Sequence, residues 1–157
     1  MINMYSIQNE IKKQEILWAE FKKLLPIGKP LIGIDYGNVR IGIAVSDNDK
    51  NLAYPFKIIS KLSELDDIVY SREACGFVIG MPYQTDGEEG STAANVRLFS
   101  ARLHEKYGLP IFYVDERYSS VRAEENMTNI NMRRKKIKKN LDANVARDLL
   151  QSVLNLG

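Results

Sequence analysis

Hydrophobic positions near the start of the chain recur with a helical spacing. Between residues 6 and 25 they return every three to four residues, with Lys and Glu between them, which predicts an amphipathic helix. Residues 26–30 contain two prolines and a glycine, which end such a pattern. We expect this helix to lie outside the main core and to pack on the domain or on another subunit. The chain therefore divides into an N-terminal helical extension, residues 1–28, and a main domain, residues 29–157.

From Pro30 onward, short apolar runs predict strands. The first two runs are joined by Gly37-Asn38, a typical β-hairpin turn, and a third run follows them. The later runs alternate with helical patterns, which favours parallel strands joined by right-handed crossovers. The pattern thus predicts an α/β fold with a three-stranded meander followed by alternating strands and helices. The predicted strands are 31–36, 39–46, 52–59, 77–81 and 111–114, and the predicted helices are 61–73, 91–107, about 120–127 and 141–154.

Composition excludes several classes of protein. The 157 residues are 45% hydrophobic and 27% charged, as is typical of a globular domain. No run approaches the ~20 apolar residues of a membrane span, and no signal-peptide pattern is visible, so we expect a cytoplasmic protein without a membrane partner. The single cysteine, Cys75, is expected to be buried, and the single histidine, His104, has no Cys or His neighbours that would indicate a zinc site.

A dense basic run precedes the last predicted helix, although the net charge of the chain is only +2. Such a run is typical either of a solvated loop or of a segment that contacts the phosphate backbone of a nucleic acid. The run alone does not decide between these interpretations. It consists of Arg133, Arg134, Lys135, Lys136, Lys138 and Lys139.

One aspartate lies within the first apolar strand. Asp35 would be costly to bury without a partner. Because side chains alternate along a strand, it should point away from the side on which Ile32 and Ile34 enter the core. Asp35 therefore either carries chemistry or caps the hairpin turn that follows it.

Further acidic residues are expected at the same edge of the sheet. Asp115 and Glu116 follow the last predicted strand, and ligands of open α/β sheets bind beyond the carboxyl ends of the strands. Asp142 lies in the first turn of the last helix, where it could simply complement the helix dipole. The strand-end acids could likewise be solvated. Carboxylates gathered at one edge would repel each other unless cations neutralised them, and their oxygens suit Mg²⁺ or Mn²⁺ in phosphodiester hydrolysis.

Four blocks of the chain resemble the YqgF/RuvX family, whose members have an RNase H-like fold. The blocks are GIDYGNVRIGIAVSD at 33–47, VIGMP at 78–82 with Asp86, Gly87 and Gly90 after it, VDERYSS at 114–120 with Ala123, and LDANVA at 141–146. The resemblance covers about residues 31–155. It implies a mixed five-stranded sheet, with a three-stranded antiparallel meander and two parallel strands flanked by helices, to which this chain adds an N-terminal helix.

The resemblance also implies a metal-dependent nuclease. Carried over residue by residue, the acidic triad of the family falls on Asp35, Glu116 and Asp142, as catalytic residues and as ligands of Mg²⁺ or Mn²⁺. Arg40, Arg117 and the basic run would hold the nucleic acid, although Arg117 could instead form a surface ion pair. Members are associated with maturation of the small-subunit ribosomal RNA precursor, and some with Holliday-junction resolution. We therefore expect a nuclease for the 5′ end of pre-16S rRNA, with a resolvase of branched DNA as the alternative and a homodimer as one arrangement of the chain.

The family pattern is not complete in this chain. The better-known junction resolvases carry an acid after the fourth strand, where Met81-Pro82 stand here, and Met81 replaces the leucine usual in this family. Three ligands support one metal better than two, with Asp115, Asp86 and Glu88 as supplements. Tyr36 could stack on a base, but a tyrosine at a strand end more often belongs to the core.

Three other functions fit parts of the pattern. A nucleic-acid-binding module without catalysis would keep the basic residues, but the retained acids argue against it. An actin-like or sugar-kinase-like ATPase also has Asp-x-Gly after a strand, but it needs two such domains and a longer chain. An assembly protein that uses the N-terminal helix is compatible with nuclease activity.

Overall fold

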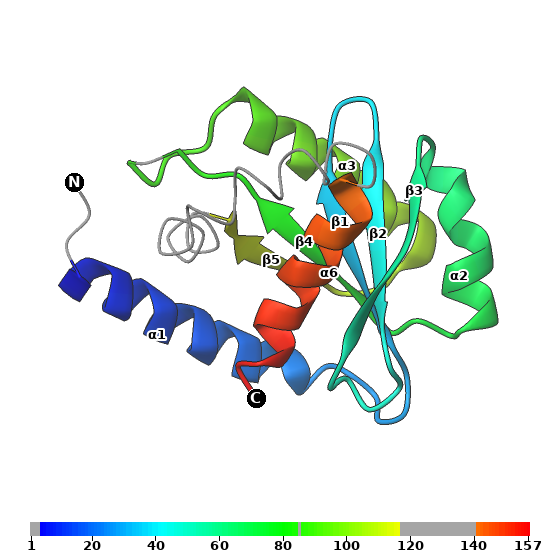
Figure 1. Cartoon of the computed structure of the whole chain (residues 1–157), viewed down its shortest axis with the longest axis horizontal. Helices are drawn as coiled ribbons and strands as arrows, with labels where there is room; N and C mark the ends of the chain where they lie inside the picture. Colours follow the sequence, from blue (N-terminus) through cyan, green and yellow to red (C-terminus); the bar gives the residue numbers. More distant parts are fainter. Residues whose placement is uncertain (1–3, 85, 117–140) are drawn as a thin grey trace.

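The computed structural model describes residues 4–84, 86–116 and 141–157, with only the backbone of residues 4–7, 141 and 142 (Figure 1). The elements are α1 (Met4–Lys22), β1 (Leu31–Tyr36), β2 (Ile41–Ser46), β3 (Ala53–Ile59), a 3₁₀ turn (Leu62–Leu65), α2 (Asp66–Ser71), β4 (Gly76–Met81), α3 (Ser91–Tyr107), β5 (Ile111–Asp115) and α6 (Leu141–Leu154). The predicted helix at about 120–127 lies outside the described residues.

The five strands form one mixed sheet in the order β3-β2-β1-β4-β5. β1 pairs with β2, and β2 with β3, in antiparallel fashion. β1 pairs with β4, and β4 with β5, in parallel. This is the antiparallel meander with two added parallel strands that the RNase H-like fold implies, and the predicted fold class is confirmed.

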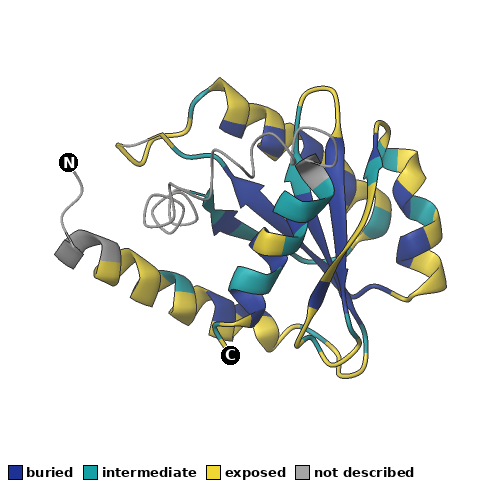
Figure 2. Cartoon of the chain, in the orientation of Figure 1, coloured by how far each residue is buried: buried dark blue, intermediate teal, exposed yellow. Residues whose placement is uncertain are grey.

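Helices cover both sides of the sheet, which explains why its central strands are nearly continuous apolar runs. Ile32, Ile34 and Phe77 pack with residues of α2 and α3 in one core cluster, and we call this side the α3 face. Leu31 and Val78 pack with residues of α6 and α1 in a second cluster, and we call this side the α6 face. Figure 2 shows the buried strands β1, β2 and β4 between these layers, with β3 exposed along the edge.

The N-terminal helix packs on the domain through its C-terminal end. Its rings of Trp18 and Phe21 lie 5.2 and 5.4 Å from the ring of Phe112 in β5. Both side chains belong to the core cluster of the α6 face, so this end of the helix is part of the core, contrary to our expectation that it would lie outside. Farther toward the N-terminus, the predicted apolar stripe leaves the domain, and Ile11 is 37% exposed.

The helix ends three residues earlier than predicted. Beyond Lys22 the backbone continues in tighter turns, in which Leu24 N donates to Phe21 O and Leu25 N donates to Lys22 O. These bonds span three residues, as in a 3₁₀ turn, and they carry the chain toward Pro26. The prolines and the glycine of 26–30 then exclude further helix, as the sequence indicated.

Two expectations from composition can be compared with the structure. Cys75 is only 5% exposed, and burial raises the pKa of its thiol, so the prediction of a buried cysteine is confirmed. In the described part of the chain, no helix combines the length and the apolar character that crossing a membrane requires.

Candidate active site

α6 lies directly against β1 because Gly33 has no side chain. A Cβ atom on Gly33 would lie 2.8 Å from Leu150 Cβ and 3.0 Å from the backbone oxygen of Ala146. The side chain of Leu150 and the backbone of Ala146 thus occupy the space that a side chain of residue 33 would fill. A glycine inside a strand often marks such a close approach.

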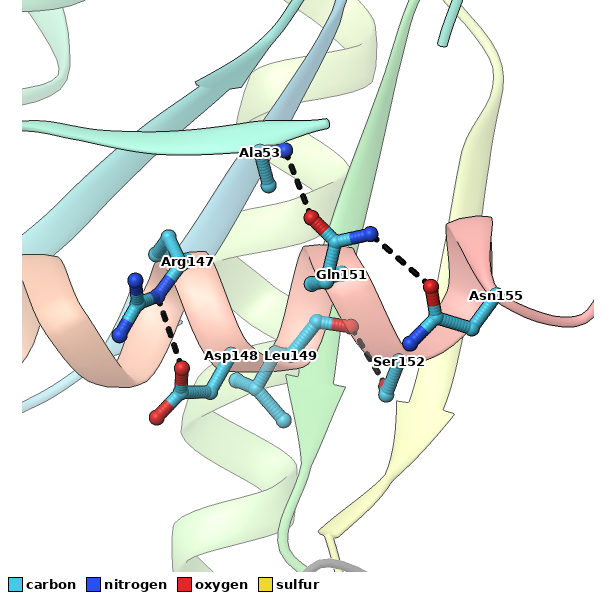
Figure 3. Close-up of polar contacts among 7 residues, drawn as sticks. All are labelled: Ala53, Arg147, Asp148, Leu149, Gln151, Ser152 and Asn155. Carbon is cyan, nitrogen blue, oxygen red and sulfur yellow. Dashed lines mark hydrogen bonds and ion pairs between the residues drawn. The ribbon is translucent and has the colours of Figure 1, made fainter. Parts of the chain in front are cut away.

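The direction of α6 places its first turn beside the end of β1. Late in the helix, Gln151 Oε1 accepts a hydrogen bond from Ala53 N at 2.8 Å (Figure 3). Ala53 pairs with Ser46, whose Oγ accepts a hydrogen bond from Leu31 N at the start of β1. The end of α6 therefore lies near the start of β1, and the two elements run in opposite directions (Figure 1).

Asp35 lies at the end of β1 that α6 approaches with its first turn. It pairs with Gly42 of β2 and is partly buried. Because Ile34 belongs to the core of the α3 face, strand alternation puts Asp35 on the α6 face, together with Leu31 and Gly33. This is the orientation that we predicted from the alternation.

Glu116 is the first residue beyond β5, and it is also partly buried on the α6 face. Val114 belongs to the core of that face, and Glu116 continues the alternation. Its carboxylate lies against Gly80 of β4, in the space that a Cβ atom would fill. The paired register of β1 and β4 ends at Ile34 and Ile79, so the next position brings Asp35 beside Gly80. Asp35 and Glu116 therefore converge over Gly80.

The environment of Glu116 disfavours its charged form. Burial, first, and the negative charge of Asp115, second, raise the pKa of the Glu116 carboxyl. A cation bound between Glu116 and Asp35 would reverse this effect, because it would stabilise both carboxylates. The raised pKa follows from burial and from the charge of Asp115 alone, and it is compatible with a role as a metal ligand.

Asp142 is the second residue of α6, four positions before Ala146 and therefore one turn away on the same side of the helix. Its backbone lies toward the end of β1, where Asp35 is located. Its side chain lies outside the described atoms, so its role as the third ligand stays a prediction.

The supplementary acids do not share this arrangement. Asp115 pairs with Met81 and alternates with Tyr113, both of which pack in the core of the α3 face, so Asp115 points to that side. Asp86 is exposed in the loop before α3, where its carboxylate accepts a hydrogen bond from the backbone N–H of Glu88. Among the described side chains, no group of three or more His, Cys, Asp or Glu residues could hold a metal ion.

The described donors nevertheless fit a hard divalent cation. Asp35 and Glu116 offer carboxylate oxygens, which Mg²⁺ and Mn²⁺ prefer. Because Gly80 has no side chain, the Glu116 carboxylate has room to lie against β4. Cys75 contacts Pro30 O just before β1, and His104 Nδ1 lies 3.1 Å from Leu109 O just before β5. Both residues are thus at the end of the parallel strands opposite the two acids, and the donor set is one of oxygen atoms.

The predicted nucleic-acid contacts are only partly described. Arg40 is exposed in the turn between β1 and β2, where Gly37 N donates to Arg40 O at 3.0 Å. This turn follows Asp35 directly, so Arg40 lies at the same end of the sheet. Arg117 and the basic run, Arg133, Arg134, Lys135, Lys136, Lys138 and Lys139, lie outside the described residues. The ring of Tyr36 packs 4.9 Å from that of Phe99 in α3, which confirms the interpretation as a core residue.

Sequence reasoning assigned no role to Gly33 and Gly80, the two glycines on which the site rests. A signal for them was present in the chain, because each interrupts a run of bulky apolar residues inside a strand. That signal does not say what approaches the glycine. The answer comes from residues that lie far away in the sequence, Leu150 for one glycine and Glu116 for the other.

The chain is similar to several known proteins. A family model described as "RuvX: Holliday junction resolvase" matches residues 29–156. A protein of Maridesulfovibrio salexigens named "Putative pre-16S rRNA nuclease" is 38% identical over 130 residues, covering 79% of this chain and 96% of its own. A protein of the same name from Rickettsia bellii is 37% identical over 142 residues, covering 87% of this chain and 92% of its own. Among solved structures, T. thermophilus RuvC in complex with a Holliday junction substrate matches 55% of this chain and 64% of that chain, with a TM-score of 0.41 and 10% identity.

Proposed function

Because this chain belongs to the RuvX family, we propose that it is a divalent-metal-dependent nuclease that hydrolyses phosphodiester bonds in the 5′-end maturation of pre-16S ribosomal RNA. The relatives that match most of the chain carry the name of that activity. The observation that carries the proposal is the convergence of Asp35 and Glu116 over Gly80, beside the first turn of α6.

In this proposal, Asp35, Glu116 and Asp142 together hold Mg²⁺ or Mn²⁺. A bound divalent ion supplies Lewis-acid stabilisation of the charge that develops on the phosphate during hydrolysis. Asp35 is held by the pairing of β1 between two strands, and Glu116 lies in the space beside Gly80. Asp35 lies within β1 and Glu116 directly follows β5, so the sheet positions both carboxylates.

The basic residues would bind the substrate backbone. Arg40 extends from the hairpin turn at the end of the sheet where Asp35 lies, and Arg117 directly follows Glu116 in the sequence. With the basic run 133–139, they would contact phosphates, which position a nucleic acid without reading its sequence. Affinity should therefore fall steeply as the salt concentration rises.

Resolution of Holliday junctions is the second candidate, because the family model that matches residues 29–156 carries that description. The same carboxylates would serve either reaction, since both hydrolyse a phosphodiester bond. The two candidates differ in the shape and the sugar of the substrate, not in the metal ligands.

The test compares the two substrates directly. Purified full-length protein with Mg²⁺ or Mn²⁺ is incubated with RNA that spans the 5′ boundary of 16S rRNA and, separately, with a four-way DNA junction. Asp35→Asn is the test variant, and Asp67→Asn, at an exposed position of α2, is the matched control. We expect metal-dependent cleavage of the RNA by the wild type and by Asp67→Asn, and none by Asp35→Asn.

Other outcomes would change the assignment. Cleavage of the junction alone would favour the second candidate. Binding of either substrate without cleavage would favour a non-catalytic binding module. Undiminished cleavage by Asp35→Asn would remove Asp35 from the site.

A further inference from the structure

We propose that Gly80 is a positioning residue, whose missing side chain seats the Glu116 carboxylate on the α6 face. This inference rests on the proposed function, because Glu116 matters there as a metal ligand. It adds a residue that touches neither metal nor substrate and acts through Glu116.

The backbone of β4 does not itself require a glycine at this position. Gly80 lies inside a regular strand whose neighbours Ile79 and Met81 are completely buried. It pairs with Val114 in the parallel ladder of β4 and β5, and its φ angle is outside the left-handed region. Glycine is normally unfavourable inside a strand, because it has more freedom to lose on folding. The reason for a glycine here must therefore be space.

Glu116 takes up that space. A Cβ atom on Gly80 would lie 3.1 Å from Glu116 Cδ and closer still to Glu116 Oε1, well inside the distance at which such atoms normally approach. The other near neighbour is Leu149 Cδ1 at 2.7 Å, which is the end of a flexible side chain and can move. An alanine would therefore displace the carboxylate, and Leu149 would adjust.

Gly33, which also lies on this face, has a different role from Gly80. The space beside Gly33 is filled by Leu150 Cβ and by the backbone oxygen of Ala146, which move only if the helix moves. Gly33 thus sets the distance of α6 from the sheet, whereas Gly80 seats a single side chain. Substituting Gly33 should shift the helix, whereas substituting Gly80 should shift the Glu116 carboxylate and the end of the Leu149 side chain and leave the helix in place.

A double-mutant cycle tests the assignment. The Mn²⁺ affinity of full-length protein is measured for the wild type, Gly80→Ala, Glu116→Gln and the double variant, from the EPR signal of free Mn²⁺. Metal ligands tolerate little displacement, and loss of a supporting neighbour typically weakens metal binding about 10–100-fold. We expect Gly80→Ala to cause a loss of that size, and to cause no further loss in the Glu116→Gln background, because the residue acts through Glu116.

Three further variants distinguish displacement of the Glu116 carboxylate from other effects of a methyl group on the α6 face. Gly76→Ala alters the same strand on the same face, where a Cβ would have no contact closer than 3.2 Å, and it should bind Mn²⁺ like the wild type. Glu116→Asp has a shorter side chain, and in the Gly80→Ala background it should recover part of the affinity. Leu149→Val removes the Cδ1 contact and should recover none. Equal losses from Gly80→Ala with and without Glu116 would overturn the proposal, and so would wild-type affinity in Gly80→Ala.

A crystal structure of metal-free Gly80→Ala separates this inference from the proposed function. We expect the Glu116 carboxylate to leave its position over β4 while α6 stays in place. If α6 shifts and Glu116 stays, the inference is wrong whatever the activity of the protein. If Glu116 moves as expected but the wild type binds no Mn²⁺, the positioning role holds and the proposed function fails.

Discussion

The two faces of the sheet use the same strands in different ways. On the α3 face, β1 and β4 present Ile34, Phe77 and Ile79, which are completely buried and fill the space beneath α2 and α3. On the α6 face, the same strands present Gly33 and Gly80, and that space is taken by residues of α6 and by a carboxylate. Bulky side chains on the α3 face stabilise the domain, and Gly33 and Gly80 on the α6 face make room for a site. Substitutions on one face should therefore alter stability, and substitutions on the other should alter function.

The largest effect should follow from a change on the α6 face. Asp35→Asn keeps the shape of the side chain but removes the charge that we propose to hold the metal. We expect cleavage to fall by roughly 10⁴-fold, equivalent to about 5.5 kcal/mol of transition-state stabilisation. The urea midpoint of the metal-free protein should stay within error of the wild type. Loss of cleavage together with a lower urea midpoint would contradict separate roles for the two faces.

The residue before Asp35 tests the opposite face. Ile34→Ala removes a completely buried side chain from the core of the α3 face, which should cost about 3 kcal/mol of unfolding free energy. The measurement is urea denaturation of the metal-free protein. Mn²⁺ affinity of the folded variant should match that of the wild type. A tenfold loss of affinity without a loss of stability would contradict the separation of the two faces.

Gly33→Ala should affect both properties, because it lies where α6 meets the sheet. The added methyl group would meet Leu150 and the backbone of Ala146, and overpacking of this kind typically costs about 1–3 kcal/mol. Moving α6 would also move Asp142, so Mn²⁺ affinity should fall together with the urea midpoint. Stability that stays at the wild-type value would show that α6 does not pack tightly against Gly33.

The smallest effect is a pH dependence on the α3 side of the molecule. The hydroxyl of Tyr107 donates to the Asp66 carboxylate at 2.5 Å, and this bond, followed by Lys106, lowers the pKa of Asp66 below its usual 3.8. A lowered pKa in the folded state stabilises the fold above about pH 4, and this stabilisation is lost as the pH falls through the pKa of the folded protein. Tyr107→Phe should therefore reduce the loss of stability below pH 4, measured by thermal unfolding across pH, and leave Mn²⁺ binding unchanged. An unaltered pH profile would show that this hydrogen bond does not lower the pKa of Asp66 in the folded protein.

Most of the fold could be predicted from the sequence, because its strands are buried on both sides and have strongly apolar sequences. The predicted bounds of the first strand, of 91–107 and of 141–154 agree with β1, α3 and α6. The segment 61–73 was predicted as one helix and is instead a 3₁₀ turn followed by the short α2. The Glu64 carboxylate accepts hydrogen bonds from the backbone N–H groups of Ser60 and Lys61, and these local bonds hold the first turn. Glu73, with a φ of 53°, then follows the end of α2.

The site could be predicted only in part. The orientation of Asp35 follows from alternation with Ile32 and Ile34, which needs no knowledge of the rest of the fold. The choice between Asp115 and Glu116 needs the register of β5 on β4, because adjacent residues at a strand end differ only in the face to which they point. The space beside Gly33 and beside Gly80 is filled by residues distant in the sequence. The roles of Arg117 and the basic run 133–139 stay predictions.

The neighbouring acids Asp115 and Glu116 offer the most direct test of the central claim, that the α6 face binds the metal. The measurement is Mn²⁺ binding to Glu116→Gln and to Asp115→Asn, compared with the wild type by EPR of the free ion. We expect Glu116→Gln to weaken binding on the order of 100-fold, because a metal ligand is lost, and Asp115→Asn, on the α3 face, to stay within about twofold of the wild type. Wild-type affinity in Glu116→Gln, or an equal loss in both variants, would contradict a metal site on the α6 face.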